Sequence, residues 1–271
     1  GKSITESDLY DAANPYANRD ARLAKTVVVN GEAWPNDLEA YNSEHPVIET
    51  YIGGYHSRTG NAAGKSYATT TSYYLKKFCN PNQILRARSG VAVTTSPHGW
   101  LTFRMGGMYL NYAEALYQYF KASGNANAAD ASGSVTYKET DGTEKTISIP
   151  ASQTAAKMAS MTRTRSGMPE FAIGMSNDEF WAKYKNERRV ELAFEGHRFY
   201  DVRRWMEDGD KFMNIHRMEI TKNDDGTFTY NKVAVTRGDG QWQTKWNFFP
   251  FSQTEIMKSG NAIVQNEGWN K

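Results

Sequence analysis

A change of pattern at residue 101 limits the possible folds of this chain more than any other property of its sequence. Residues 1–100 show little helical periodicity and are rich in Gly, Asn, Ser, Thr and Pro, which predicts loops with short strands. From residue 101 onward, apolar residues recur at intervals of three and four, as on one face of a helix. We therefore expect a mainly α-helical fold with long loops and small β-hairpins.

Periodicity and capping signals predict four helices in the second part of the chain. The first two cover residues 105–120 and 152–165, and each is followed within a few residues by glycine. The third covers residues 176–205, because Ser176 stands three residues before a glutamate in the capping-box pattern. The same spacing after Ser252 predicts a short final helix.

Alternating apolar and polar residues predict strands and hairpins. Residues 135–149 and 218–235 each alternate around an Asp-Gly dipeptide, which suits the turn of a β-hairpin. Residues 26–29 predict a strand that enters a tight Asn-Gly turn, and the β-branched and aromatic residues of 69–78 predict another strand.

The densest group of ionisable side chains lies between residues 186 and 205. Glu187, Glu191 and Glu195 follow one another at four-residue steps, which places them on one face of the predicted helix. Arg188, Arg198 and Arg204 lie three or four residues from Glu191, Glu195 and Asp201, so we interpret this segment as a structural ion-pair ladder. Its members are Glu187, Arg188, Glu191, Glu195, Arg198, Asp201 and Arg204.

Catalytic and metal-binding readings of this string are less favourable. A di-metal carboxylate site would need a Glu-x-x-His pair on two helices, whereas Glu195 and His197 are only two residues apart. Glycoside hydrolysis needs two acids beside a cleft, and here each acid has an arginine close in sequence. No phosphate-binding loop, dinucleotide fingerprint or His-Glu-x-x-His motif occurs, and no motif places a nucleophile beside His197. We expect no enzymatic activity, no metal and no cofactor.

Charge and hydropathy exclude two further classes of partner. The 32 basic and 30 acidic residues nearly cancel, so the sequence predicts no nucleic-acid partner. The apolar runs are far shorter than the roughly 18 residues that a membrane-spanning helix needs. Cys79 is the sole cysteine, which excludes a disulfide or a cysteine metal site within the chain.

Aromatic residues in the predicted loops form a candidate ligand site. The chain has 7 Trp, 16 Tyr and 12 Phe, and flat rings can stack on sugars while amide and guanidinium groups bind the hydroxyls. The same rings can instead pack the loops onto helices, and composition alone leaves both readings open. The candidates are Trp34, Tyr51, Tyr55 and Trp100 for stacking, with Asn36 and Arg58 for hydrogen bonding.

Five segments resemble, in the same order, the motifs of the C-terminal half of the SusD/RagB family of Bacteroidetes surface lipoproteins. The segments are residues 14–23 (NPYANRDARL), 103–116 (FRMGGMYLNYAEAL), 162–169 (TRTRSGMP), 186–205 (NERRVELAFEGHRFYDVRRW) and 248–269 (FFPFSQTEIMKSGNAIVQNEGW). Ala21, Ser166, Phe251 and Glu267 stand where the family usually has another residue.

The resemblance implies a SusD-like α-helical fold in which residues 1–271 form the C-terminal domain. In this reading residues 1–100 carry the ligand site, residues 101–271 are the helical part with hairpin insertions, and the tetratricopeptide-like N-terminal half is absent from this chain. The family motifs hold the fold together, and ligand contacts vary between members.

The resemblance also implies a function. It predicts a non-catalytic protein that captures an oligosaccharide or polysaccharide for nutrient uptake and delivers it to a SusC-like TonB-dependent transporter. The protein would lie on the extracellular face of the outer membrane, in contact with the membrane only through a lipid anchor on the missing N-terminal segment. A peptide-binding or scaffolding relative in the same type of uptake complex is the alternative.

Overall fold

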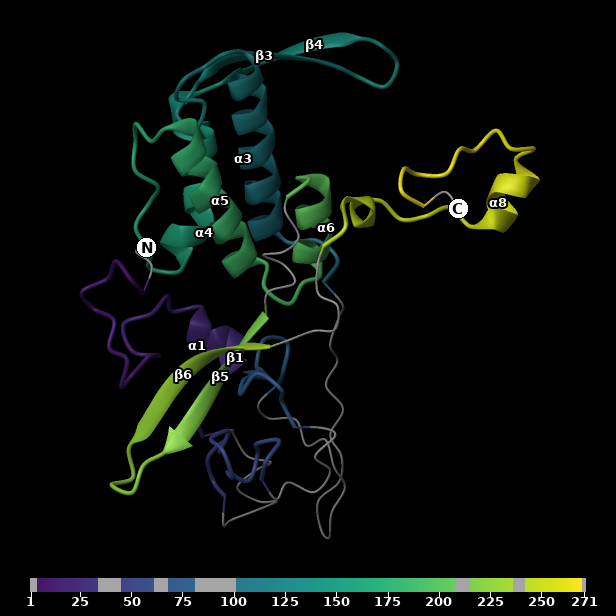
Figure 1. Ribbon diagram of the computed structural model, residues 1–271. Helices are drawn as coiled ribbons and strands as arrows, with labels where there is room; N and C mark the ends of the chain where they lie inside the picture. The colour runs from purple at the N-terminus through teal and green to yellow at the C-terminus, as the bar shows by residue number, and fades with distance from the viewer. Residues whose placement is uncertain are drawn as a thin grey trace. The chain divides into compact units, whose positions relative to one another are not determined.

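The computed structural model describes residues 4–33, 45–60, 68–80, 101–207, 215–235 and 242–269 (Figure 1). The chain forms two compact units, and each unit combines an early and a late stretch of sequence. The first comprises residues 1–27 and 76–194, and the second comprises residues 28–75 and 195–271. Helices and small two-stranded sheets make up both units, which confirms the predicted mixture of helices with short hairpins.

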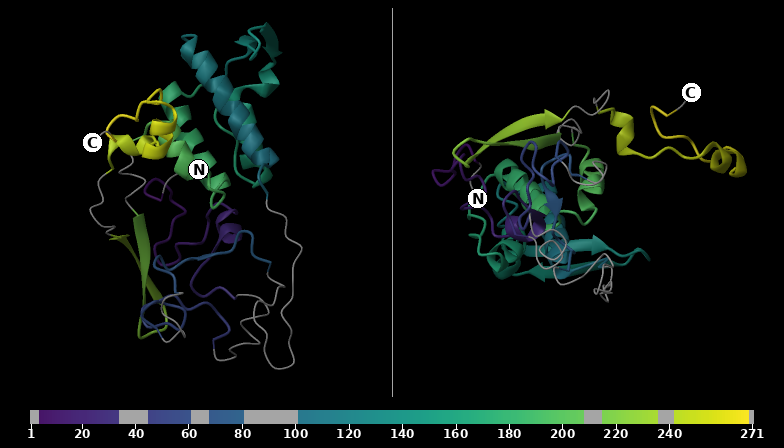
Figure 2. Two further views of the ribbon diagram at one scale, coloured as in Figure 1. Left: turned by 90° about the vertical axis from the view of Figure 1, so that its right-hand side faces the viewer. Right: turned by 90° about the horizontal axis from the view of Figure 1, so that it is seen from below.

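Three helices form the centre of the first unit. They are α3 (Met105–Ala122), α4 (Ala155–Arg165) and α5 (Asn177–Glu191), and they lie side by side in both views of Figure 2. The first unit also holds the short helix α1 (Leu23–Thr26) and the 3-10 turn η2 (Ala151–Gln153).

Large aromatic side chains fill the space between α3 and α5. Tyr117 of α3 and Phe180 and Tyr184 of α5 are fully buried, and their rings pack against one another. The Tyr184 hydroxyl donates to the Leu110 carbonyl at 2.7 Å, so this buried polar atom is satisfied. The helical periodicity of the sequence therefore reflects a common core.

Local signals in the sequence set the ends of these helices. Ser176 Oγ accepts a hydrogen bond from the Glu179 amide at 3.3 Å, and Thr154 Oγ1 caps α4 in the same way through Lys157. Gly124 follows α3 with a φ of +82°, a conformation that glycine adopts without steric cost. The predicted helices at 105–120 and 152–165 are confirmed.

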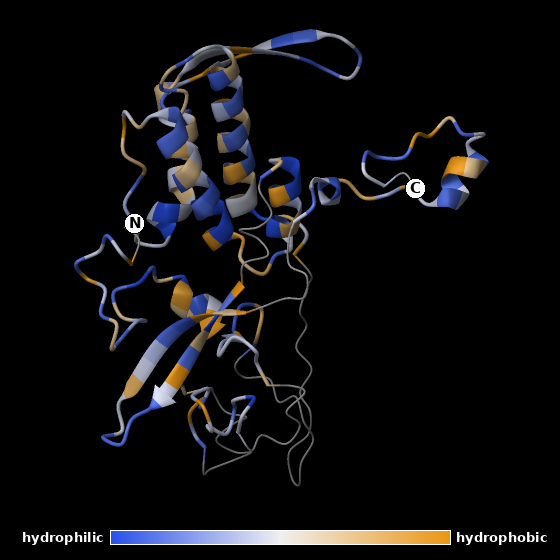
Figure 3. Cartoon of the chain, viewed as in Figure 1, coloured by the Kyte–Doolittle hydropathy of each residue, from blue (hydrophilic) through white to orange (hydrophobic). Residues whose placement is uncertain are grey.

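The first hairpin lies in the first unit. Strands β3 (Gly133–Lys138) and β4 (Glu144–Ile149) pair antiparallel, and the Thr143 amide donates to Asp141 Oδ1 at 2.8 Å within the turn. Figure 3 shows that hydrophilic residues predominate on this hairpin, which agrees with the exposure of most of its side chains.

The second unit is built around a longer hairpin. Strands β5 (Ile215–Lys222) and β6 (Phe228–Val235) pair antiparallel, and two short strands, β1 (Val27–Val28) and β2 (Tyr74–Leu75), form another sheet. Late residues add α6 (His197–Arg204), the 3-10 turn η3 (Thr244–Asn247) and α8 (Gln253–Lys258). Helix α8 begins after Ser252, whose hydroxyl accepts from the Glu255 amide as the capping-box spacing predicts.

The single helix predicted for residues 176–205 is wrong. Helix α5 ends at Glu191 and α6 begins at His197. Between them, Phe194 and Gly196 have φ values of +63° and +79°, which a right-handed helix cannot contain. Glu195 therefore does not share a helical face with the acids of α5.

The strand predicted for residues 69–78 is also mostly wrong. Only Tyr74 and Leu75 pair as a strand. Ser72 and Phe78 have φ values of +67° and +70°, which interrupt an extended backbone on either side. None of the described helices is both long and apolar enough to cross a bilayer.

Candidate functional site

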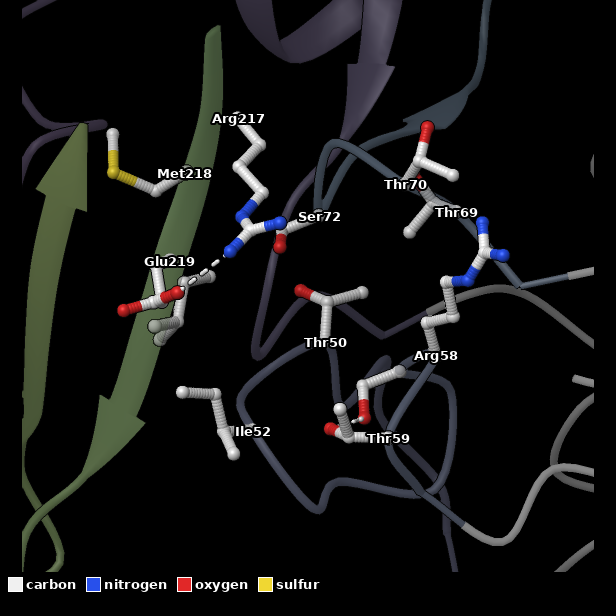
Figure 4. A pocket seen from close by; sticks show the side chains of 12 residues that line it. Thr50, Ile52, Arg58, Thr59, Thr69, Thr70, Ser72, Arg217, Met218 and Glu219 are labelled. Atoms are coloured by element: carbon white, nitrogen blue, oxygen red, sulfur yellow. Dashed lines mark hydrogen bonds and ion pairs between the residues drawn. The ribbon is translucent and has the colours of Figure 1, made fainter. Parts of the chain in front are cut away.

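The second unit contains a cavity of about 340 Å³, within the size range of small-molecule sites (Figure 4). Three segments contribute to it: a loop at 50–59, a loop at 69–72, and strand β5. The lining residues are Thr50, Ile52, Ser57, Arg58, Thr59, Thr69, Thr70, Ser72, Arg217, Met218, Glu219 and Ile220.

Backbone hydrogen bonds attach both loops to strand β5. The Ile52 amide donates to the Ile220 carbonyl at 2.8 Å, and the Met218 amide donates to the Thr71 carbonyl at 3.2 Å. These groups lie on the edge of β5 that faces away from β6, because alternate residues of a strand direct their backbone groups to opposite sides. The loops are thereby held in register with the hairpin.

Internal contacts also fix the shape of the 50–59 loop. Thr59 Oγ1 accepts from the Gly53 amide at 2.9 Å and lies 3.1 Å from Ser57 Oγ, which in turn donates to the Gly54 carbonyl. A Cβ atom at Gly60 would collide with the Gly54 carbonyl oxygen, so only glycine permits this approach. The loop therefore presents its side chains from an ordered backbone.

Thr50 is a buried polar residue of the cavity. Its exposed fraction is 3%, and no group of the described residues hydrogen-bonds to its Oγ1. Its amide donates to Asn30 Oδ1 at 2.9 Å, which fixes the backbone. Figure 4 shows the Thr50 side chain between β5 and Arg58, with its hydroxyl turned toward Ser72 and the strand. A buried hydroxyl without a partner costs about 1–3 kcal/mol, so a bound polar group at this point would be stabilised.

Charged side chains lie on two sides of the cavity. Arg217 and Glu219 are two residues apart on one face of β5 and form an ion pair with an Nη2–Oε2 distance of 3.0 Å. Arg58 extends from the opposite loop toward Thr69 and Thr70 (Figure 4). In the part of the chain that the structure describes, no carboxylate forms an ion pair with Arg58.

Tyr51 and Tyr55, the candidate stacking residues that the structure describes, make internal contacts and are not among the residues that line this cavity. The Tyr51 ring lies 5.6 Å from that of Phe228 and 5.5 Å from Lys222 Nζ. The Tyr55 ring stacks on His45 at 4.2 Å. Of the six candidates, Arg58 alone is placed in the cavity. Trp34, Asn36 and Trp100 lie outside the described residues, and a ligand-binding role stays a prediction for all six.

A second group of ionisable side chains stabilises the loop that carries Thr50. Glu49 Oε2 lies 2.9 Å from His45 Nδ1 and accepts from the Tyr55 amide, while His56 Nδ1 accepts from the Glu49 amide at 3.1 Å. Burial lowers the pKa of His56, an effect that the Glu49 carboxylate opposes and the His45 ring reinforces. The neutral form of His56 is therefore the one that fits this loop.

The acids of the predicted ladder have partners far away in the sequence. Glu187 accepts from Arg22 at 2.6 Å and Arg163 at 3.1 Å, and both Glu187 and Glu191 are almost fully buried. Glu191 accepts from Arg22, Arg104 and Arg165 at 2.8, 2.6 and 2.9 Å. Burial acts to raise the pKa of Glu191, but hydrogen bonds from Arg104 and Arg22 outweigh it and hold the pKa below its usual value.

Arginines of the predicted ladder also make contacts of their own. Arg204 pairs with Asp201 at 2.9 Å, three residues away. Arg188 donates to Asn111 Oδ1, and Arg198 pairs with Glu207 at 3.5 Å. Within the described ranges, no three His, Cys, Asp or Glu side chains come together in a way that could hold a metal ion.

Hydroxyl residues of the cavity did not stand out in the sequence. The run Thr69-Thr70-Thr71-Ser72 instead favours the start of a strand, because threonine is common in strands. Four consecutive hydroxyl residues beside a glycine-rich loop are the signal that could have marked them. Thr50 and the Arg217–Glu219 pair carry no comparable signal, since their roles depend on burial and strand register.

Comparisons with known proteins agree with this architecture. A family model described as the SusD family matches residues 1–269. The solved structure of a SusD-like protein from Bacteroides fragilis superposes with a TM-score of 0.61 at 22% sequence identity. The match covers 94% of this chain and 40% of that protein, so this chain spans about two-fifths of its length. No curated protein matches the chain.

Proposed function

This chain belongs to the SusD family, and from that premise we propose that it is a non-catalytic surface protein that captures an oligosaccharide. It delivers this nutrient to a SusC-like TonB-dependent transporter. In this proposal the protein works on the extracellular face of the outer membrane and is held there by a lipid anchor N-terminal to the residues of this chain.

The cavity beside β5 carries the proposal. Its lining offers hydroxyls from Thr50, Thr70 and Ser72, and sugars are recognised through networks of hydroxyl hydrogen bonds. The decisive observation is the buried Thr50 Oγ1, which has no partner among the described residues. A ligand hydroxyl at this position would satisfy it.

The environments of the carboxylates support binding without catalysis. Glycoside hydrolysis requires one carboxylic acid and one free carboxylate on either side of the scissile bond. Glu219 is the one carboxylate among the cavity residues that the structure describes, and it is paired with Arg217. Glu187 and Glu191 are buried and bound by arginines in the other unit, so they are not available as acid or base.

Affinity electrophoresis tests the proposal. The full chain is run through gels that contain plant, host or microbial polysaccharides, and we expect one polymer to retard it. The Thr50→Val variant, which loses the buried hydroxyl, should be retarded less. A folded protein that no polysaccharide retards, and that binds peptides instead, would establish the peptide-binding alternative and overturn the proposal.

A further inference from the structure

The charge balance of the cavity beside β5 is uneven. Arg217 is neutralised by Glu219 at 3.0 Å, which leaves Arg58 as the cation without a carboxylate partner among the described residues. Arg58 is exposed and reaches the cavity from the loop opposite β5. The protein as a whole carries a formal net charge of only +2, so this local positive charge does not belong to a general basic surface.

The remaining lining is suited to a polyhydroxylated ligand. No aromatic ring is among the described residues that line the cavity, so these residues offer no flat apolar face on which a neutral sugar ring could stack. The polar contacts that they offer are therefore the basis of the inference. The hydroxyls of Thr50, Thr70 and Ser72 supply uncharged hydrogen bonds, and Arg58 supplies a forked donor that matches the oxygens of an anionic group.

The edge of β5 that faces away from β6 disfavours a peptide ligand, because both loops already bind it. Extended peptides bind sheet edges by pairing their backbone with exposed strand groups. On β5 the Met218 amide is already bound to Thr71, and the Ile220 carbonyl is already bound to Ile52. These two loops occupy the edge that an added strand would use, so the cavity is accessible to a ligand that binds through its side groups.

We propose that this cavity binds an anionic sugar of the captured glycan and that Arg58 contacts its negative group. The group is a carboxylate of a uronic acid or a sulfate ester, since both present the planar or tripodal oxygens that a guanidinium binds. The Thr50 and Ser72 hydroxyls contact the hydroxyls of the same sugar. This inference rests on the proposed function, because it assumes that the ligand is a glycan.

Calorimetric titration of the full chain with matched trisaccharides tests the inference. The probes are trigalacturonic acid, a sulfated galactan trisaccharide and neutral galactotriose, with triglutamate as an acidic peptide. We expect at least one anionic trisaccharide to bind and galactotriose to bind at least about tenfold more weakly, because a charge-assisted contact is missing. Raising the salt concentration should weaken the anionic ligand more than the neutral one.

Two variants separate the role of Arg58 from general charge. Arg58→Gln should weaken the anionic trisaccharide about tenfold and leave galactotriose unchanged. Arg189→Gln removes the same charge from an exposed position on α5 and should have no effect. Because Arg58 is exposed, its variant should keep the melting temperature of the wild type.

Each other outcome overturns the inference in a distinguishable way. Equal binding of galactotriose and the anionic sugars, or of triglutamate and trigalacturonate, would overturn the proposal that the cavity selects an anionic sugar. An unchanged affinity of Arg58→Gln removes Arg58 as the contact. Retardation by a neutral polysaccharide together with no anionic binding leaves the proposed glycan capture standing, whereas binding of triglutamate alone overturns both proposals.

Discussion

A substitution at Thr50 should change glycan affinity without lowering the stability of the fold. Valine has nearly the shape of threonine but no hydroxyl, so Thr50→Val removes the buried atom that lacks a partner in the described part of the chain. We expect the free energy of unfolding to stay the same or rise by up to about 1 kcal/mol, because no satisfied hydrogen bond is lost. Glycan affinity should fall about two- to tenfold. Denaturant titration and calorimetry measure the two effects.

Thr221 provides the matched control for this change. It lies one residue beyond Ile220 on the same strand, is exposed and does not line the cavity. Thr221→Val should leave affinity and stability within experimental error. If Thr50→Val instead lowered the stability and left the affinity intact, its hydroxyl would belong to the folded structure and would have no role in binding.

Two adjacent glycines at the start of α3 should respond in opposite directions to the same substitution. A Cβ at Gly106 would collide with Arg104 Nη1 and lie 2.9 Å from Glu191 Oε1, whereas a Cβ at Gly107 meets only Leu192 Cδ2 at 3.9 Å. Gly106→Ala should therefore disturb the buried ion pair and lower the free energy of unfolding by about 1–3 kcal/mol. Gly107→Ala should raise it by about 0.5 kcal/mol through higher helix propensity. Equal effects in urea titrations would show that the Arg104 contact does not constrain this turn.

The loop of residues 45–57 should make the stability of the chain depend on pH. Burial holds the pKa of His56 below its unfolded value of about 6.5, so the unfolded chain takes up the proton first. The contribution of His56 is complete above that value and is lost as the pH falls from about 6.5 through the lower folded pKa. Protonation would also remove the acceptor that His56 Nδ1 offers to the Glu49 amide.

The His56→Asn variant tests this dependence, because its amide oxygen can accept the same hydrogen bond and does not titrate. Urea midpoints measured between about pH 7.5 and about pH 5 should fall more steeply for the wild type than for the variant. His216→Asn, at an exposed position of β5, should keep the wild-type slope. Parallel slopes for wild type and His56→Asn would rule out His56 as the titrating group.

At the level of elements, the sequence was informative where the cause of structure is local. The caps at Ser176 and Ser252 and the turn at Asp141 depend on neighbours within three residues, and they were predicted correctly. The break after Glu191 was missed because the charged periodic pattern continues through it. There the chain passes from one compact unit to the other, and the contacts that decide its course are distant in sequence.

The candidate site illustrates the same division between local and distant causes. The sequence makes Arg58 a candidate because its guanidinium lies in a predicted loop and can bind ligand hydroxyls, and the structure places it among the residues that line the cavity. Thr50 could not be predicted from the sequence. Its role depends on its burial and on a hydroxyl without a hydrogen-bond partner among the described residues, and no local sequence pattern encodes either property. Tyr55 was chosen for its aromatic ring, yet the fold places that ring on His45.

At the scale of the whole molecule, the network in the first unit explains why separate motifs occur together. Arg22, Arg104, Arg163 and Arg165 come from three motif segments, and they converge on Glu187 and Glu191 of a fourth. Each buried carboxylate needs several of these donors at once, because a buried charge that loses its partner is strongly destabilising. These four motif segments therefore act together as one structural element of the first unit, apart from the ligand site that we propose in the second unit.

Because the ion-pair network and the proposed ligand site lie in different units, we can predict which segments a ligand will stabilise. Local unfolding of the cavity segments requires a bound ligand to dissociate. A ligand that binds only the folded cavity therefore raises the free energy of this local unfolding, by an amount set by its concentration relative to Kd. At a hundredfold excess over Kd, amides of residues 50–59, 69–72 and β5 that exchange through this local unfolding should exchange about a hundredfold more slowly. Amides of α3, α4 and α5 belong to the other compact unit and should keep their rates. Hydrogen exchange followed by mass spectrometry, with the glycan that retards the chain, measures both sets in one sample. Protection of the three helices without protection of the cavity segments would place the ligand on the first unit and refute the assignment of the site to β5 and its loops.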